Sequence, residues 1–485
     1  MFFSGHSTNN VLTKWGQTLS LTCTIGMFSN FSHADVTSYE LIDLGVFEEG
    51  SSLSIAYGIN DVGQIVGLGD GAITAEDDES TEDVNEQTRD FYAHAGIHDG
   101  MGWMDLGAFE FNPEGFEQTA IDLVETDFIL SSSIGFDINI LGDVVGYATE
   151  YRPDINVAEF VTTVERPVRY DGTQWVVLDP AIEVAGRATA INDDQMIVGY
   201  SRTETATDSE LFRNLAWYHD GTDEGVFNFI PLPSDDVNRF STVVDINNSN
   251  RVVGTTNGID LGGDVFDRAF YFDVASSTEA IGINTLGGSE NSAAAVNNNG
   301  VIVGSSYLDG DPIGSVGGFP YFIEYAFLFD PASGQGPINL GTLSEEVFRF
   351  SKALDINDVN QVVGYSNIGR RLGFNISHAF IYENEQMTDL NVMIDCKLGW
   401  ELSEARSINN LGQIVGTGIF NDEQRAFLLN PVEDGTPADQ SCDANEEGNI
   451  LDENNEGGSL YSTFFWLLFA LLGVKVAQTR IVTRH

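Results

Sequence analysis

The stretch Gly58-Ile-Asn-Asp-Val-Gly-Gln-Ile-Val-Gly67 decides the fold, because variants of it recur along the chain. It reads as a short strand that ends in Ile-Asn, a tight turn, and a second strand that ends in Val-Gly. Asn and Asp tolerate left-handed backbone and hydrogen-bond it locally, which explains their recurrence in the turn. Seven copies follow one another at spacings of 50 to 79 residues, closing at Gly67, Gly146, Gly199, Gly254, Gly304, Gly364 and Gly416.

Each unit has a second half, in which a small residue precedes an aromatic or aliphatic pair, as in Ala269-Phe-Tyr and Ala379-Phe-Ile. A turn and a short Asp-Leu strand follow. Short runs of β-branched and aromatic residues bounded by Gly, Asn and Asp are typical of strands and hairpins. The repeat therefore predicts an all-β, seven-bladed β-propeller with four-stranded blades over residues 35–431.

The position of one strand distinguishes a closed ring from a β-solenoid, the alternative fold that also repeats. The seventh unit has no Asp-Leu strand after Leu429-Asn-Pro431, whereas a spare copy, Tyr39-Glu-Leu-Ile-Asp-Leu-Gly45, precedes the first Ile-Asn strand. We expect this N-terminal strand to complete the last blade and to remove the open sheet edges.

The two segments that flank the repeats look like targeting signals. Residues 1–34 carry an apolar stretch followed by Ser32-His-Ala34, the pattern of a signal peptide with its cleavage site. After an acidic linker at 432–456, which we expect to be disordered, the tail 457–485 holds an apolar run, Leu460–Val474, followed by basic residues. Fifteen such residues are short for a transmembrane helix but can insert into a thinned bilayer.

Export would remove Cys23 and leave an even pair, Cys396 and Cys442. An oxidising compartment favours a disulfide between them, and two buried free thiols are the alternative.

The Gly457-Gly458-Ser459 motif, apolar run and basic end resemble the GlyGly carboxy-terminal sorting signal of Gram-negative bacteria. That resemblance implies trimming by an intramembrane protease and delivery to the cell surface. The basic residues are scattered rather than clustered, so a plain membrane anchor is the alternative.

The repeat itself resembles the HAF repeat of bacterial extracellular proteins, and Ser377-His-Ala-Phe380 contains the triplet that names it. The layout of the whole chain is also similar to an uncharacterised family of exported gammaproteobacterial proteins. This resemblance implies an extracellular propeller and no particular chemistry.

The composition limits the partners. The chain has 74 Asp and Glu against 21 Lys and Arg, a formal net charge of −53, and all the acidic residues lie in 35–458. Such a field repels phosphate backbones, so we expect no nucleic-acid partner. A salt-tolerant surface explains the acidity; a cation store or a basic partner is the alternative.

Few residues suggest a site. Asp245-Ile-Asn247 and Asp355-Ile-Asn357 look like the start of a calcium loop, but most copies hold a residue at the next ligand position that cannot coordinate, such as Val359 after Asn357. We therefore favour turn chemistry over calcium, and we predict no metal, cofactor or catalytic residue. The adjacent Arg370 and Arg371, expected in a variable loop, are the best candidates for contact with an anionic ligand, or else form an ordinary surface pair.

The sequence thus predicts an exported protein of the cell surface, extracellular space or periplasm that binds an unidentified ligand or surface partner without catalysis. Propellers place variable loops around a shared rim, which suits binding. The alternatives are an exported hydrolase or lyase with a site at the channel, and a structural component of a surface layer. Rings of Asn, Ser and Ala in the channel would favour binding or scaffolding, whereas clustered His, Arg and carboxylates would favour an enzyme.

Overall fold

The computed structural model of the protein describes residues 36–47, 53–70, 93–109, 132–153, 161–178, 185–204, 212–222, 226–232, 240–259, 265–308, 314–316, 319–321, 323–344, 349–371, 374–432 and 435–442. The predicted signal peptide, most of the predicted linker and the whole tail with Gly457, Gly458 and Ser459 lie outside these residues.

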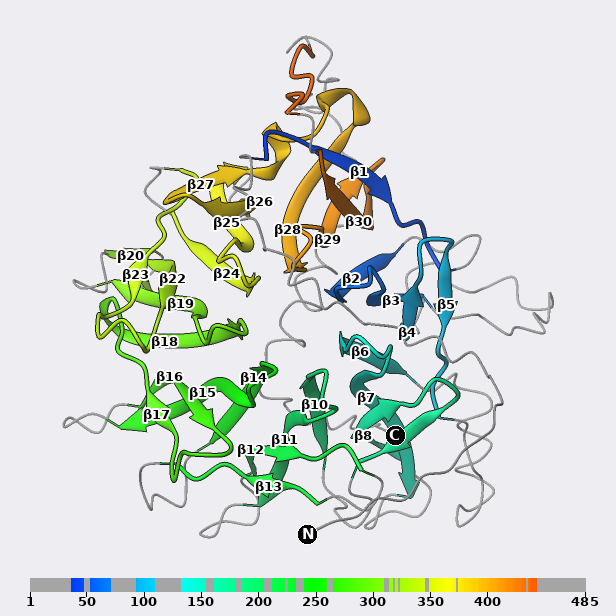
Figure 1. Cartoon of the computed structure of the whole chain (residues 1–485), viewed down its shortest axis with the longest axis vertical. Helices are drawn as coiled ribbons and strands as arrows, with labels where there is room; N and C mark the ends of the chain where they lie inside the picture. Colours follow the sequence, from blue (N-terminus) through cyan, green and yellow to red (C-terminus); the bar gives the residue numbers. More distant parts are fainter. Residues whose placement is uncertain are drawn as a thin grey trace, which may run out of the picture.

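The chain forms seven four-stranded antiparallel sheets. Figure 1 shows that these sheets are arranged in a ring. This confirms the seven-bladed β-propeller and excludes the solenoid. Blade one consists of β2 (Ser54–Ile59), β3 (Ile65–Asp70), β4 (Ala93–His98) and β5 (Trp103–Asp105), and blade two of β6 (Ser133–Ile138), β7 (Val144–Pro153), β8 (Val161–Tyr170) and β9 (Trp175–Val177). Blade three consists of β10 (Gly186–Ile191), β11 (Ile197–Glu204), β12 (Phe212–His219) and β13 (Asn228–Phe229). Blade four consists of β14 (Ser241–Ile246), β15 (Arg251–Ile259), β16 (Val265–Asp273) and β17 (Ile281–Gly282).

Blades five and six follow the same order, with one added hairpin that the repeat pattern does not predict. They consist of β18 (Gly287–Val296), β19 (Ile302–Leu308), β22 (Glu324–Phe329) and β23 (Ile338–Asn339), with the hairpin β20 (Gly314–Val316) and β21 (Phe319–Tyr321) inserted; then β24 (Ser351–Ile356), β25 (Val362–Arg371), β26 (Phe374–Glu383) and β27 (Gln386–Asp389). Two short 3₁₀ turns, η1 (Leu390–Val392) and η2 (Cys396–Leu398), lead into blade seven.

The N-terminal strand completes the last blade, as predicted. Blade seven consists of β28 (Trp400–Ile408), β29 (Ile414–Phe420), β30 (Glu423–Pro431) and β1 (Tyr39–Asp43), and β1 pairs with β30 from Tyr39 opposite Pro431 to Asp43 opposite Phe427. In Figure 1 the blue β1 lies beside the orange strands of blade seven. Both ends of the ring-forming chain therefore meet in one sheet.

The predicted disulfide is present and spans this closing blade. Cys396 and Cys442 are joined with a Cα–Cα distance of 6.1 Å. The Cys396 backbone N–H also donates to the Asp439 carbonyl, and the Lys397 ammonium lies 2.7 Å from the Asp439 carboxylate. Residues 435–442, the described part of the predicted linker, are thus attached to blade seven.

The glycine that ends each Val-Gly phrase is required by close packing of the two inner strands. A Cβ at Gly67 would overlap the Ile55 carbonyl oxygen, and a Cβ at Gly364 would overlap that of Lys352. In every blade the inner strand has a β-bulge beside this glycine, as between Ala56 and Gly58. Glycine therefore lets the bulged strand approach its neighbour.

The core lies between neighbouring blades. Val66 and Ala95 of blade one pack with Val144 and Val168 of blade two, and all four are fully buried. The Ala-Phe strands explain the second half of the repeat, because their alanines allow close approach of the sheets and their phenylalanines fill the gaps, including the fully buried Phe327 and Phe427. In the part of the chain that the structure describes, no helix has both the length and the apolar character needed to cross a membrane.

Candidate functional site: the central channel

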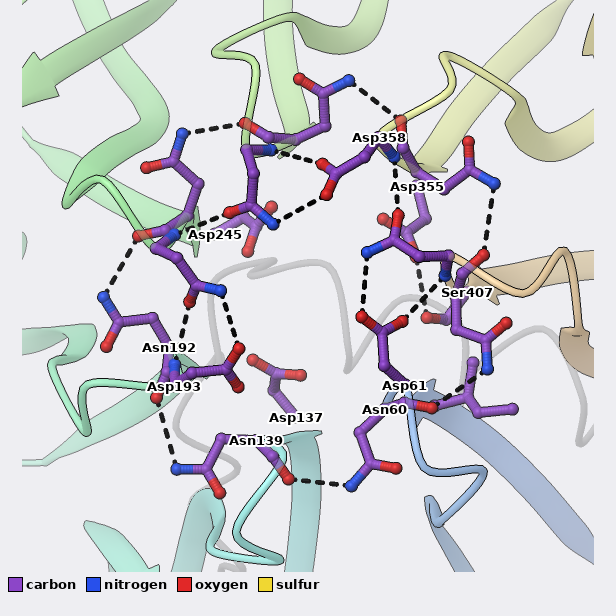
Figure 2. Close-up of a pocket in the computed structure, with 18 of the residues that line it drawn as sticks. Asn60, Asp61, Asp137, Asn139, Asn192, Asp193, Asp245, Asp355, Asp358 and Ser407 are labelled. Atoms are coloured by element: carbon purple, nitrogen blue, oxygen red, sulfur yellow. Dashed lines mark hydrogen bonds between the residues drawn. The ribbon is translucent and has the colours of Figure 1, made fainter. Parts of the chain in front are cut away.

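The channel opens on the face that carries the tight turns between the first two strands of each blade, called here the turn face. A cavity of about 180 Å³ at this opening is lined by the Ile-Asn ends of all seven inner strands. Figure 2 shows these side chains converging from the surrounding blades. The cavity has room for several water molecules, but it is smaller than the roughly 300–1,000 Å³ of most small-molecule sites.

A closed circle of hydrogen bonds runs around this opening through the asparagine of each Ile-Asn. Each Nδ2 donates to the backbone carbonyl of the equivalent asparagine in the next blade, at 2.8–3.3 Å, and the last bond returns from blade seven to blade one. The members are Asn60, Asn139, Asn192, Asn247, Asn297, Asn357 and Asn409, all buried.

The same asparagines also close their own turns. The Asn60 Oδ1 accepts the backbone N–H groups of Val62 and Gln64, and Asn409 does the same for Leu411 and Gln413. The turns contain left-handed positions, such as Asn360 with φ 64°. The predicted role of these asparagines in the turn is therefore correct, but it accounts only for the side-chain oxygen and not for the Nδ2, which bonds to the next blade.

A second circle of hydrogen bonds lies one residue further out, on exposed side chains. The backbone N–H of each residue donates to the side-chain oxygen of its equivalent in the next blade, at 2.8–3.0 Å, for six of the seven blades. The circle is interrupted in blade two, where Ile140 offers no acceptor to Asp61. Its members are Asp61, Ile140, Asp193, Asn248, Asn298, Asp358 and Asn410.

Three carboxylates, Asp137, Asp245 and Asp355, line the channel below the asparagines. The two oxygens of Asp245 accept the N–H of Ile246 in its own strand and that of Val296 in the next blade, both at 2.7 Å. Asp137 and Asp355 make the equivalent bonds to blades three and seven. The carboxylates thus join the blades in pairs, two with three, four with five and six with seven, and leave blade one without one.

Burial raises the pKa of all three carboxyl groups above the ordinary range. The pKa of Asp245 rises to about 8, because burial disfavours its charge and because Asp137 and Asp355 repel it, although the two backbone N–H donors oppose the shift. The pKa values of Asp137 and Asp355 each rise to about 6, again chiefly through burial.

The arrangement is suited to holding blades together more than to binding a metal. No group of three His, Cys, Asp or Glu among the described residues could hold a metal ion. The contacts of Asp245 and Asp355 favour a role between blades over a calcium loop, because one oxygen of each accepts an N–H of its own strand and the other accepts an N–H of the next blade. Ser407 donates to Asp355 at 2.7 Å, and the cavity lining includes no histidine to activate that hydroxyl.

The predicted ligand residues Arg370 and Arg371 are not in a loop. They form the end of β25, opposite Asn375 and Phe374 of β26. The hairpin has a register shift between Asn367 and Gly369 and continues beyond it, so these arginines lie at the end of a strand and the expected loop position is wrong. Contact of these arginines with an anionic ligand stays a prediction.

Sequence reasoning named Asp245 and Asp355 only as the start of a possible calcium loop and missed Asp137 and the link that all three make between blades, although the repeat contains a signal for it. The residue before each Ile-Asn or Val-Asn alternates between a small residue and Asp around the ring, in the order Gly58, Asp137, Ala190, Asp245, Ala295, Asp355 and Ser407. An aspartate that recurs only in every second blade cannot serve the turn that all blades share.

Several solved structures have a similar shape at 12% sequence identity or less. The Trypanosoma rangeli sialidase in complex with the inhibitor DANA is 12% identical with a TM-score of 0.33, and the match covers 81% of this chain and 59% of the sialidase. YCF48 bound to D1 peptide is 10% identical with a TM-score of 0.41, and the match covers 82% of this chain and 98% of YCF48. The PL25 ulvan lyase bound to its saccharide is 9% identical with a TM-score of 0.39, and the match covers 81% of this chain and 94% of the lyase. This chain therefore spans less than two thirds of the sialidase, and at these TM-scores the likenesses carry no inference about activity. No curated protein matches the chain. A family model described as "Protein of unknown function (DUF3466)" matches residues 173–343 and 337–436, more than half of the chain, and the chain therefore belongs to this family.

Proposed function

We propose that the protein is an exported propeller of the cell surface or periplasm that binds a ligand or a surface partner without transforming it. One observation carries this proposal: the polar groups that line the turn-face cavity are engaged in hydrogen bonds between blades. A catalytic site needs polar groups that are free to meet a reacting atom. Recognition would then fall to the rims and faces of the ring.

The chemistry of the lining supports the same conclusion. Among the residues that line the described cavity, the ionisable ones are all aspartates, with no lysine, arginine, histidine or cysteine. Hydrolysis or elimination of an anionic polymer would require a cation or a hydrogen-bond donor to stabilise the developing negative charge. The predicted export and surface address, including the HAF-type repeat and the sorting signal, remain part of the proposal.

Thermal unfolding of the protein against a panel of oligosaccharides, small metabolites and divalent ions tests the proposal. A ligand present at 100 times its dissociation constant adds about 2.7 kcal/mol to the free energy of unfolding. We expect one class of ligand to raise the melting temperature without being consumed, and calcium to leave it unchanged. Turnover of a saccharide in the same samples would favour the enzyme instead.

A further inference from the structure

The turn face has an apolar half. The third residue of each inner turn points outward, and in four successive blades it is aliphatic and 56–65% exposed: Val359, Leu411, Val62 and Leu141 of blades six, seven, one and two. Blades three, four and five hold Asp194, Ser249 and Asn299 at the same position. Exposed apolar side chains gathered on adjacent elements indicate an interaction surface.

Two more exposed side chains extend this half. Ile140, 42% exposed, is the residue that interrupts the second circle of hydrogen bonds, and Met101, 91% exposed, belongs to the outer turn of blade one. That turn lies on the same face, because His98 at the end of β4 pairs with Ile65 at the start of β3. These six residues are called here the apolar arc.

Hydrogen bonds join the inner turns that carry the arc, and between blades one and two the link is the donation from the Asn60 Nδ2 to the Asn139 carbonyl. The Asp358 N–H donates to the Asn410 side chain, and the Asn410 N–H donates to Asp61, both at 2.8 Å. The inner turns of blades one, two and six contain aspartates (Asp61, Asp143 and Asp358), and the inner turns of all four blades lack lysine and arginine. An occupant that suits both features is apolar and positively charged, whereas a second copy would bring like charges together.

One segment of this chain has that chemistry. Leu460–Val474 is apolar and aromatic, Lys475, Arg480 and Arg484 follow it, and no acidic residue occurs after Ser459. Strand β30 ends beside the arc, because Asn430 accepts a 2.7 Å hydrogen bond from Gln413 in the turn of blade seven, and the chain then runs to Cys442, which the disulfide holds at Cys396.

The connection is long enough. The described chain ends at Cys442, and the 17 residues 443–459 can span up to roughly 55–60 Å when extended. A tether of this length gives the tail a high effective concentration at the turn face. We propose that, in the unprocessed chain, Leu460–Val474 docks on the apolar arc, so that the propeller covers its own tail until the tail is delivered or trimmed.

Trypsin tests this inference, because Lys475, Arg480 and Arg484 place its cleavage sites in the tail. The full chain, in detergent-free buffer, is compared with the double variant Leu141→Asp/Leu411→Asp, which puts like charge on the arc. We expect tail cleavage, followed by mass spectrometry, to be roughly tenfold faster in the double variant, since cleavage tracks the population of the undocked state. Ser249→Asp, at the same turn position in the polar half, is the matched control and should cleave like the wild type.

Two results would overturn the inference. Equal cleavage rates in all three proteins would mean that the arc does not hold the tail. Protection that increases with protein concentration would mean that a second copy, and not the chain's own tail, covers the arc. Thermal melting of each variant shows that the ring is intact, and neither result affects the binding proposal for the rims.

Discussion

Asp245 is a carboxylate whose environment opposes its charge. It lies inside the ring, faces two other carboxylates across the channel, and has only backbone N–H groups as partners. Its pKa of about 8 in the folded chain compares with about 3.9 for an unfolded chain. Between these values the folded chain holds a proton that the unfolded chain releases. The contribution of this group to stability is therefore greatest below about pH 4 and falls as the pH rises to about 8.

The variant Asp245→Ala should reveal this dependence. Alanine fits the position, since Ala190 and Ala295 occupy it in blades three and five. At pH 5 we expect the variant to be less stable by about 1–3 kcal/mol, because the N–H groups of Ile246 and Val296 lose their acceptor. The difference should shrink by pH 9, and melting temperatures across this range check it. A difference that grew with pH would show that the charged carboxylate stabilises the ring.

The repeated turn is the element that both closes a hairpin and joins two blades. Asn297 illustrates this, because its Oδ1 accepts from Val301 in its own turn while its Nδ2 donates to Asn357 and Asn360 of the next blade. One amide side chain thus couples the local conformation to the order of the ring.

We expect Asn297→Ala to lower the free energy of unfolding by roughly 2–4 kcal/mol, since it removes several buried hydrogen bonds worth about 1 kcal/mol each. Asn297→Asp should be no better, because it places an acceptor against the Asn357 carbonyl. The exposed neighbour Asn298 provides the control, and Asn298→Ala should cost less than about 1 kcal/mol. Urea unfolding measures all three; equal losses at the two positions would contradict a buried coupling role.

At the scale of the element, the sequence predicted the strands and turns within each blade but not the hydrogen bonds between blades. The Ile-Asn turn, the four strands and the offset strand at Tyr39 are written in local patterns, and all are present. The donation from Asn60 to Asn139 joins residues 79 positions apart, so no local pattern shows it. The channel carboxylates can be recognised in the sequence only by comparing the seven copies of the repeat with one another. The bulge beside Gly67 has no signal in the sequence except the glycine itself.

The whole molecule depends on the closing blade, and the disulfide reinforces it. A cross-link over 46 residues removes enough freedom from the unfolded chain to add up to about 4 kcal/mol in the chain-entropy model. We therefore expect Cys396→Ser to lower the urea midpoint, Cys442→Ser to lower it equally, and the double variant to be no worse than either. Additive losses would mean that the two cysteines stabilise the fold separately.

Strand β1 is the first of the described strands along the chain, and its partner β30 is the last of them. Its neighbour Ser38 bonds to Thr436, 398 residues further along the chain, and a ribosome needs on the order of 20–80 s to cover that distance. Throughout that time the blades already synthesised cannot close the ring, and the asparagine of the newest blade has no next blade to which it can donate. A chain broken off before Glu423 lacks β30 and cannot pair β1. The joint therefore acts as a check on the completeness of the ring, because only a chain that includes β30 can pair β1 and lose this exposed sheet edge.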